Sequence, residues 1–275
     1  MKALVYTGPN TMRYRDEDDP SRGAGEVVIE VDAVGICGSD MHAYHGHDPR
    51  RVPPMILGHE LAGVIVEGDG LGRRVTVNPL ITCGACEYCV TGRDNLCAHR
   101  TMIGMTRAGG FAERMSIPAS SLIELPPGMD MRTAALTEPA ATGLHALNLA
   151  MRALARPLPE LRTLVIGGGA VGLLVALLAR AYGCRSVSVA ETNALRRASA
   201  ARAGDLRVHD PAAGEGPAPG TVDLVIDAVG GKSTRKAALD AVKPGGICRR
   251  RAMAILGGRW GLDAPLRTGF TSTVP

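Results

Sequence analysis

Four of the seven cysteines lie close together, at a spacing typical of a metal site. The segment reads Cys83-Gly-Ala-Cys86-Glu-Tyr-Cys89, and Cys97 follows after seven further residues. Two-residue spacers let a tight turn point successive thiolates at one centre, and four thiolates complete the tetrahedral shell of a structural zinc ion. Because four protein ligands leave no open position, such a site would brace the polypeptide rather than catalyse a reaction.

Two other uses of these cysteines remain open from the sequence. The same C-x2-C-x2-C spacing opens the bacterial ferredoxin pattern, in which a fourth cysteine follows after three residues and precedes a proline. Here seven residues intervene, and Ala98 follows Cys97. An odd cysteine total and an N-terminus without an apolar signal core argue against a disulfide framework, so zinc is favoured over a cluster, disulfides or free thiols.

A glycine-rich turn in the second half has the spacing of a dinucleotide site. Gly167, Gly169 and Gly172 lie between an apolar strand-like run at 162–167 and an apolar helical stretch that reaches residue 181. Such glycines allow a tight turn and a close approach of backbone to pyrophosphate, and the helix N-terminus favours negative charge there. The alternative is a glycine-rich turn that binds nothing.

An acidic residue at the end of the next predicted strand bears on the choice of cofactor. The strand at 186–190 precedes Glu191, which can accept hydrogen bonds from adenosine ribose hydroxyls and would repel a 2′-phosphate. We therefore expect NAD rather than NADP. Arg196 and Arg197 weaken that preference, because a nearby arginine can receive the extra phosphate.

The remaining pattern predicts two domains of different class. Strand-like segments at 206–209 and 222–227 and a helix at 233–242 continue the alternation of a doubly wound, parallel α/β sheet. Short β segments at 27–34, 61–67 and 74–78 instead indicate an irregular β-rich domain that carries the cysteines. The predicted division is 1–150, 151–247 and an atypical basic tail at 248–275.

Composition and charge exclude several classes of protein. The 275 residues are 45% hydrophobic and 21% charged, which is typical of a globular chain. The net charge of +4 comes from residues 248–275, which contain five arginines and one aspartate. The sequence therefore indicates no basic surface for binding nucleic acid. With no export signal and no apolar run of membrane-spanning length, we expect a cytoplasmic protein without nucleic-acid or membrane partners.

Several motifs occur in an ordered series along residues 1–246. They are Gly25-Glu26-Val-Val, Val34-Gly-Ile-Cys37-Gly-Ser39-Asp40, Leu57-Gly58-His59-Glu60, the four cysteines, Gly109-Gly-Phe111-Ala-Glu113, Thr137-Glu138-Pro139 and the glycine turn at 167–172. Together they resemble the zinc-dependent medium-chain alcohol dehydrogenases, and within them the polyol branch that contains sorbitol and threonine dehydrogenases. The resemblance implies a GroES-like catalytic domain followed by a Rossmann domain.

The resemblance also implies roles for individual residues. Cys37, His59 and Glu138 would hold a catalytic zinc ion with one open position, while Glu60 matches a residue that approaches or ligates the metal in some members. Ser39 and His42 match a relay that carries the alcohol proton to solvent. Cys83, Cys86, Cys89 and Cys97 match the ligands of a second, structural zinc.

The implied reaction is oxidation of a secondary alcohol, a polyol or an amino alcohol, with hydride transfer to NAD. A homo-oligomer is expected from the family. Some of these residues have simpler alternatives. Ser39 or Asp40 could cap a short helix at 41–44, and Glu138 before Pro139 could be a surface residue at a helix start.

The C-terminal segment departs from the family pattern. After Pro244-Gly-Gly-Ile-Cys248 the chain enters Arg249-Arg-Arg251, which we expect to make a poor buried parallel strand. We expect the sheet to end after its fourth strand at an incomplete edge, which would weaken nicotinamide placement and put the oligomer interface in doubt. A truncated or frame-shifted C-terminus is the corresponding hypothesis, and a zinc-braced, nucleotide-binding remnant without turnover is the alternative function.

Overall fold

The computed structural model describes residues 1–250 and 271–273, and the chain forms two compact units. The units are Met1–Glu138 and Pro139–Pro275. Their division falls in the first turn of α4 (Thr137–Met151), earlier than the boundary near residue 150 that the sequence predicts. Packing explains the difference, because Leu147 and Ala150 of this helix are buried in the core of the second unit.

The first unit is built on a five-stranded antiparallel sheet, as the β-rich pattern predicts. Its strand order is β10-β6-β5-β3-β9, with β3 at Glu26–Gly35, β5 at Glu60–Glu67, β6 at Arg74–Val77, β9 at Arg114–Pro118 and β10 at Leu122–Glu124. Alternate residues such as Ile29, Leu61 and Ile65 point to one face and form its core. The short helix α3 (Met131–Ala135) packs against β3 and β5.

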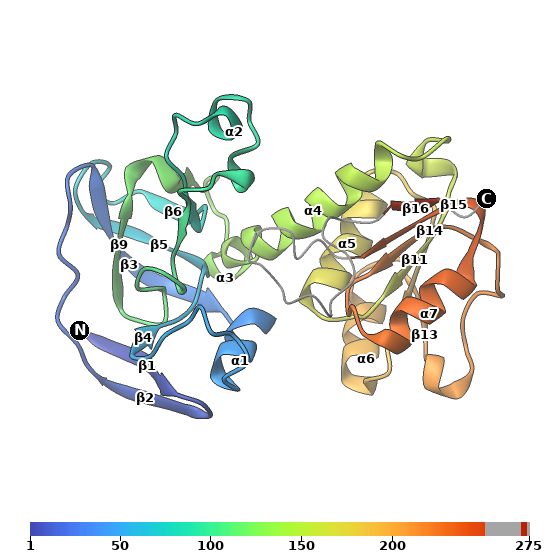
Figure 1. Ribbon diagram of the computed structural model, residues 1–275, viewed down its shortest axis with the longest axis horizontal. Helices are drawn as coiled ribbons and strands as arrows, with labels where there is room; N and C mark the ends of the chain where they lie inside the picture. Colours follow the sequence, from blue (N-terminus) through green and yellow to red (C-terminus); the bar gives the residue numbers. More distant parts are fainter. Residues whose placement is uncertain (251–270, 274–275) are drawn as a thin grey trace. The chain divides into compact units, whose positions relative to one another are not determined.

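Smaller elements of the first unit surround this sheet. A second sheet has the order β2-β1-β4, with β1 at Lys2–Gly8, β2 at Thr11–Asp16 and β4 at Met55–Ile56. The helix α1 (Gly38–Tyr44) follows β3 directly. The cysteine segment forms a lobe from β7 (Leu80–Ile81), α2 (Glu87–Val90), a 3-10 turn at Asp94–Leu96 and β8 (Thr101–Met102). Figure 1 shows α2 in the loop that extends from the sheet of this unit.

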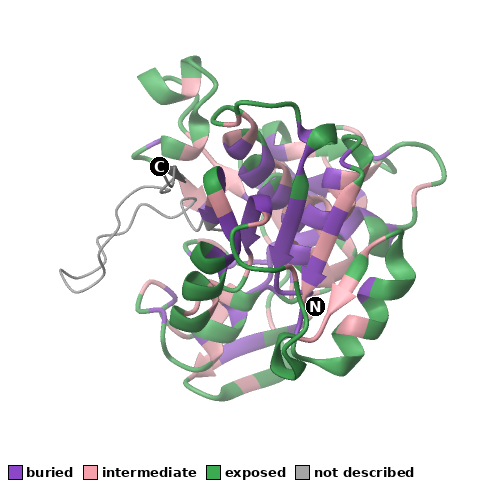
Figure 2. Cartoon of the chain, turned by 90° about the vertical axis from the view of Figure 1, so that its right-hand side faces the viewer, coloured by how far each residue is buried: buried purple, intermediate pink, exposed green. Residues whose placement is uncertain are grey.

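The second unit is a doubly wound sheet with helices on its faces, which confirms the predicted fold class. The order is β13-β12-β11-β14-β15-β16, and β11 to β15 run parallel. The elements are β11 (Arg162–Ile166), α5 (Ala170–Ala181), β12 (Ser186–Ala190), α6 (Ala194–Ala203), β13 (Arg207–His209), β14 (Val222–Asp227), α7 (Lys232–Ala241), β15 (Val242–Arg250) and β16 (Thr271–Thr273). Figure 2 shows the buried central strands and the exposed outer faces of the helices.

The last strands overturn one expectation from the sequence. The arginine-rich segment does not end the sheet, because β15 continues to Arg250 parallel to β14, and β16 then adds an antiparallel strand. Ladder hydrogen bonds come from the backbone, and Ile247, only 1% exposed, supplies an apolar anchor for the strand. Arg249 is buried too, and burial lowers the pKa of its guanidinium. The rest of the predicted basic tail, 251–270 and 274–275, lies outside the described residues.

None of the helices in the described part of the chain is long and apolar enough to cross a lipid bilayer.

The core of the second unit predicts a measurable stability difference between two leucines. Leu224 lies in the central strand β14 with no exposed surface, whereas Leu195 on α6 is 80% exposed. Leu224→Ala would leave a cavity and lower the free energy of unfolding by about 2–5 kcal/mol. Leu195→Ala is the matched control and should change it by less than about 0.5 kcal/mol. Urea unfolding followed by circular dichroism measures both, and equal effects would contradict this description of the core.

Candidate metal centres and cofactor site

A buried cluster of potential metal ligands forms where the end of β3 lies beside the start of β5. Cys37 is the N-cap residue of α1, and His59 and Glu60 stand at the start of β5. One ligand atom from each of these three side chains lies within 4.8 Å of those of the other two. A thiolate, an imidazole and a carboxylate are a donor set that zinc accepts, and three protein ligands leave a position for a substrate oxygen.

Strand register and a missing side chain make room for the carboxylate of this cluster. The antiparallel ladder pairs Gly35, the last residue of β3, with Glu60. A β-carbon on Gly35 would collide with the Glu60 carboxylate and would pack tightly, at 3.1 Å, against the Glu60 β-carbon. Gly58, with φ of +90°, turns the chain just before His59, and a β-carbon there would meet the ring of Phe111. The absence of a side chain at Gly35 therefore leaves room for the Glu60 carboxylate, and Gly58 allows the turn that places His59 in this position.

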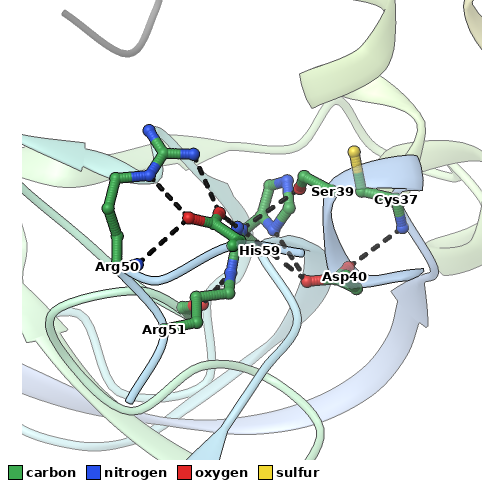
Figure 3. Close-up of polar contacts among 8 residues, drawn as sticks. Cys37, Ser39, Asp40, Arg50, Arg51 and His59 are labelled. Carbon is green, nitrogen blue, oxygen red and sulfur yellow. Dashed lines mark hydrogen bonds and ion pairs between the residues drawn. The ribbon is translucent and has the colours of Figure 1, made fainter. Parts of the chain in front are cut away.

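Asp40 links the cysteine to the histidine. Its Oδ2 accepts a 3.0 Å hydrogen bond from the backbone N–H of Cys37, and its Oδ1 lies 3.6 Å from Nδ1 of His59 (Figure 3). All three residues are buried. A carboxylate beside a ligating imidazole fixes the ring orientation and strengthens the ligand.

The electrostatics of the cluster fit a cation. Burial by itself lowers the pKa of His59, but the neighbouring Asp40 carboxylate and Cys37 thiol outweigh it and raise that pKa to about 10. Within the described chain, the buried atoms His59 Nδ1 and Asp40 Oδ1 have no hydrogen-bond partner. A pocket that favours positive charge and combines soft and hard donors suits a divalent transition metal.

The other residues assigned to this centre are placed differently. Ser39 is half-buried on α1, whereas His42 is exposed three residues later on the same helix, so the two share a helix face. Glu138 is half-buried in the first turn of α4 and lies outside the group of three ligand atoms. Asp40 is not a lone cap for the helix, since it bonds back to Cys37 in a reciprocal capping arrangement.

The four lobe cysteines form a second group of potential ligands. The Sγ–Sγ separations are 3.4 Å for Cys86 and Cys89, 3.6 Å for Cys83 and Cys97, and 3.8 Å for Cys83 and Cys89. A tetrahedron with metal–sulfur bonds of about 2.3 Å has sulfur–sulfur edges of about 3.8 Å. Backbone N–H groups of Ala85 and Cys86 lower the pKa of the Cys83 thiol to about 6, so a thiolate is available near neutral pH.

These separations favour a single ion over the alternative uses of the cysteines. All seven cysteines are free, and the lobe distances far exceed the roughly 2.05 Å of a disulfide bond. An iron–sulfur cluster places several irons and inorganic sulfides between its cysteines, which requires a wider spacing than one ion does. The lobe therefore fits one zinc ion best.

The glycine turn of the second unit has the geometry of a dinucleotide site. Gly167 has φ of +99°, and a β-carbon on Gly172 would collide with the Gly167 carbonyl, so α5 packs closely on the end of β11. Gly169 is the N-cap of α5, and a β-carbon there would meet nothing within 4 Å. The helix N-terminus thus presents open backbone for a phosphate group.

Glu191 is held at this turn by the backbone. Its two carboxylate oxygens accept 2.8 Å hydrogen bonds from the N–H groups of Gly168 and Asn193. Burial raises the pKa of Glu191, but these hydrogen bonds outweigh it and lower the pKa, so the carboxylate is charged. Arg196 is mostly exposed, with Nη1 4.0 Å from the Glu191 carboxylate, whereas Arg197 is bound to Asp210 at 2.8 Å.

The sequence did not identify Gly35, Asp40 and Arg51 as residues that support the metal cluster. Gly35 and Asp40 lie inside the motif that contains Cys37. The signal for Gly35 was available, because a glycine at the end of a strand can make room for a ligand on the paired strand. Arg51 carried no signal, because an arginine in a polar loop is ordinarily exposed. The structure buries it completely.

Comparison with known proteins gives the family. Residues 23–127 match the alcohol dehydrogenase GroES-like domain. L-galactonate-5-dehydrogenase of Escherichia coli is 34% identical over 90% of this chain and 74% of its own length. Sorbitol dehydrogenase of Halalkalibacterium halodurans is 40% identical over 66% of this chain and 54% of its length, and L-threonine 3-dehydrogenase of a Marinomonas species is 35% identical over 70% and 57%.

Solved structures agree with these relatives. A zinc-binding dehydrogenase of Sinorhizobium meliloti, solved with NADP, superposes with a TM-score of 0.82 at 34% identity and covers 94% of this chain and 78% of that chain. Galactitol-1-phosphate dehydrogenase of Escherichia coli gives a TM-score of 0.80 at 26% identity, covering 91% and 75%. The alignments to several curated relatives thus span little more than half of the relatives' length. The chain belongs to the zinc-dependent medium-chain alcohol dehydrogenases, in the branch that contains sorbitol and threonine dehydrogenases.

Proposed function

We propose that this protein is a zinc- and NAD-dependent dehydrogenase that oxidises a secondary alcohol of a polyol or an amino alcohol. The observation that carries the proposal is the buried cluster of Cys37, His59 and Glu60, whose donor set suits a metal with an open position. The same chain holds a glycine turn and a carboxylate in the arrangement of a dinucleotide site.

Cys37, His59 and Glu60 would hold the catalytic metal, with Asp40 orienting His59. Glu138 is proposed as a second carboxylate available to that metal, because its motif matches the family position. When bound, the zinc ion acts as a Lewis acid that lowers the pKa of an alcohol, and the nicotinamide accepts the hydride. Cys83, Cys86, Cys89 and Cys97 would hold a second zinc that braces the lobe.

Ser39 and His42 would move the alcohol proton. Ser39 is half-buried one turn before the exposed His42 on α1, so a proton accepted by the hydroxyl can leave through an imidazole that faces solvent. Burial of Cys37, His59 and Glu60 excludes water from the ligand side of the site.

Glu191 supports NAD as the cofactor. Its carboxylate is charged and bound to the glycine turn, where it can accept hydrogen bonds from ribose and repels a 2′-phosphate. Arg197 is engaged by Asp210 and by the Glu191 carbonyl, which leaves Arg196, 4.0 Å from the Glu191 carboxylate, as the cation available for a phosphate. Formation of a homo-oligomer stays a prediction from the family.

The alternative function is a zinc-braced, nucleotide-binding remnant without turnover. One expectation behind it was a sheet that ends after four strands, whereas β15 and β16 continue the sheet in the described chain.

Purified protein should oxidise members of a panel of polyols and amino alcohols with formation of reduced nicotinamide. The kcat/KM with NAD should exceed that with NADP by about tenfold or more, because Glu191 opposes the 2′-phosphate. Absorbance at the reduced-nicotinamide band gives both values, and removal of metal with a chelator should abolish the rate. A protein that binds zinc and NAD but oxidises no alcohol in the panel would contradict the proposal.

Loss of one lobe cysteine should remove one zinc ion and loosen the lobe. Cys97 is fully buried in the four-cysteine group, so Cys97→Ser breaks the tetrahedral shell. Native mass spectrometry should then count one zinc fewer per chain than in the unaltered protein. Cys184→Ser, at a buried cysteine outside the lobe, is the matched control and should keep the full count. Equal zinc content in both variants would rule out the lobe as a metal site.

A methyl group at Gly35 should weaken the catalytic centre through Glu60. The new β-carbon would occupy the space of the Glu60 carboxylate, so we expect Gly35→Ala to lose zinc from this centre during dialysis against a weak chelator. Gly38→Ala is the control, because a β-carbon there meets nothing within 4 Å. Zinc retention by Gly35→Ala equal to that of Gly38→Ala would show that Glu60 is not a ligand.

A further inference from the structure

Arg51 has a completely buried guanidinium next to the cluster. Its side chain is 0% exposed, which is rare for an arginine unless all of its donors are paired. Nη1 donates to Asp48 Oδ2 at 2.6 Å, Nε donates to the Gly104 carbonyl at 2.9 Å, and Nη2 donates to Ser39 Oγ at 3.1 Å (Figure 3). Each of the three guanidinium nitrogens therefore has a partner.

Neutralising Asp48 does not by itself explain this buried charge. Arg50, which is partly exposed, already binds both oxygens of Asp48, at 2.7 Å from Nε and 2.8 Å from Nη2. Asp48 thus has a bidentate partner without Arg51. The other interactions of Arg51 with side chains are made by Nη2, which donates to Ser39 Oγ and lies 4.0 Å from Asp40 Oδ1.

The contact with Ser39 limits what its hydroxyl can do. A serine hydroxyl has one proton to donate and two lone pairs that accept. The N–H of Arg51 occupies one lone pair, which leaves one acceptor and one donor. A relay needs those two functions, one to receive a proton and one to pass a proton on. Because the guanidinium is fixed by Asp48 and Gly104, it also fixes the position of Ser39 Oγ.

We propose that Arg51 is a positioning residue that holds the Ser39 hydroxyl for proton transfer. The inference rests on the proposed function, since it needs Ser39 to act as the relay. In this role Arg51 acts through Ser39 and touches neither the substrate nor a metal ligand.

The first test compares Arg51→Met with Arg50→Met, its matched control. Arg50 shares the Asp48 partner but has no contact with Ser39 in the described chain. Misplacement of a reacting group by about 1 Å can cost about 100-fold in rate, so kcat of Arg51→Met should fall by about that factor with KM changed far less. Arg50→Met should keep kcat within threefold, and native mass spectrometry should count the same zinc in both. Loss of zinc from Arg51→Met, or an unchanged kcat, would overturn the proposal.

A double-mutant cycle then separates action through Ser39 from a general structural effect. If Arg51 acts through Ser39, the pair Ser39→Ala with Arg51→Met should have the kcat of Ser39→Ala alone, within about threefold. Independent losses that multiply would overturn the proposal. Should Arg51→Met fail to fold, Arg51→Lys replaces it in the cycle, because a lysine keeps the charge and can place only one ammonium where the guanidinium reaches three partners.

A third readout needs no turnover and so distinguishes failure of this inference from failure of the proposed function. In protein labelled with ¹⁵N-arginine, the Arg51 guanidinium N–H signals should be protected from solvent exchange, and Ser39→Ala should shift them. Signals that do not respond to Ser39→Ala would overturn the proposal whatever the activity. An inactive protein in which the signals do shift would instead remove the proposed function while leaving the Arg51–Ser39 contact in place, and the inferred role in proton transfer would fall with it.

Discussion

The antiparallel pairing of β3 with β5 decides where the first candidate metal centre forms. The ladder places Gly35 opposite Glu60, and Cys37 then stands two residues beyond the end of β3. His59 and Glu60 enter the same place from the other strand. A slip of one residue in this register would turn the alternating side chains to the opposite face and separate the ligands. The apolar core of Ile29, Leu61 and Ile65 resists such a slip, because the same alternation buries these side chains.

The buried charged side chains near the paired ends of β3 and β5 each have polar partners. Asp40 faces Cys37 and His59, and Arg51 faces Asp48 and Ser39. Burying ions is costly unless hydrogen bonds satisfy them, so a site of this kind is stable only when the whole set is present. Two of the buried atoms that have no hydrogen bond in the described chain are Oδ1 of Asp40 and Nδ1 of His59, the pair beside the ligand cluster. A metal ion at the cluster would supply the positive charge that this pair favours.

Much of the fold could be predicted, because the periodic spacing of apolar residues and the spacing of glycines can be recognised within short segments of the sequence. The strand at 186–190 and the glycine turn before α5 appear where the pattern predicts them. Arg51 could not be found this way, since its burial depends on Asp48, Gly104 and Ser39, which a sequence does not place together. The strand β15 was missed for the same reason. Its arginines predicted a poor buried strand, whereas its pairing with β14 is made by backbone hydrogen bonds that do not depend on the side chains.

The proposed function depends most on whether the two groups of potential ligands bind metal. Native mass spectrometry of the purified, folded chain counts the metal ions directly, with zinc identified by its mass. We expect two zinc ions per chain, which would mean that both the Cys37–His59–Glu60 cluster and the four-cysteine lobe bind metal. A single zinc ion would leave only the lobe as a metal site and would contradict the assignment of a catalytic centre.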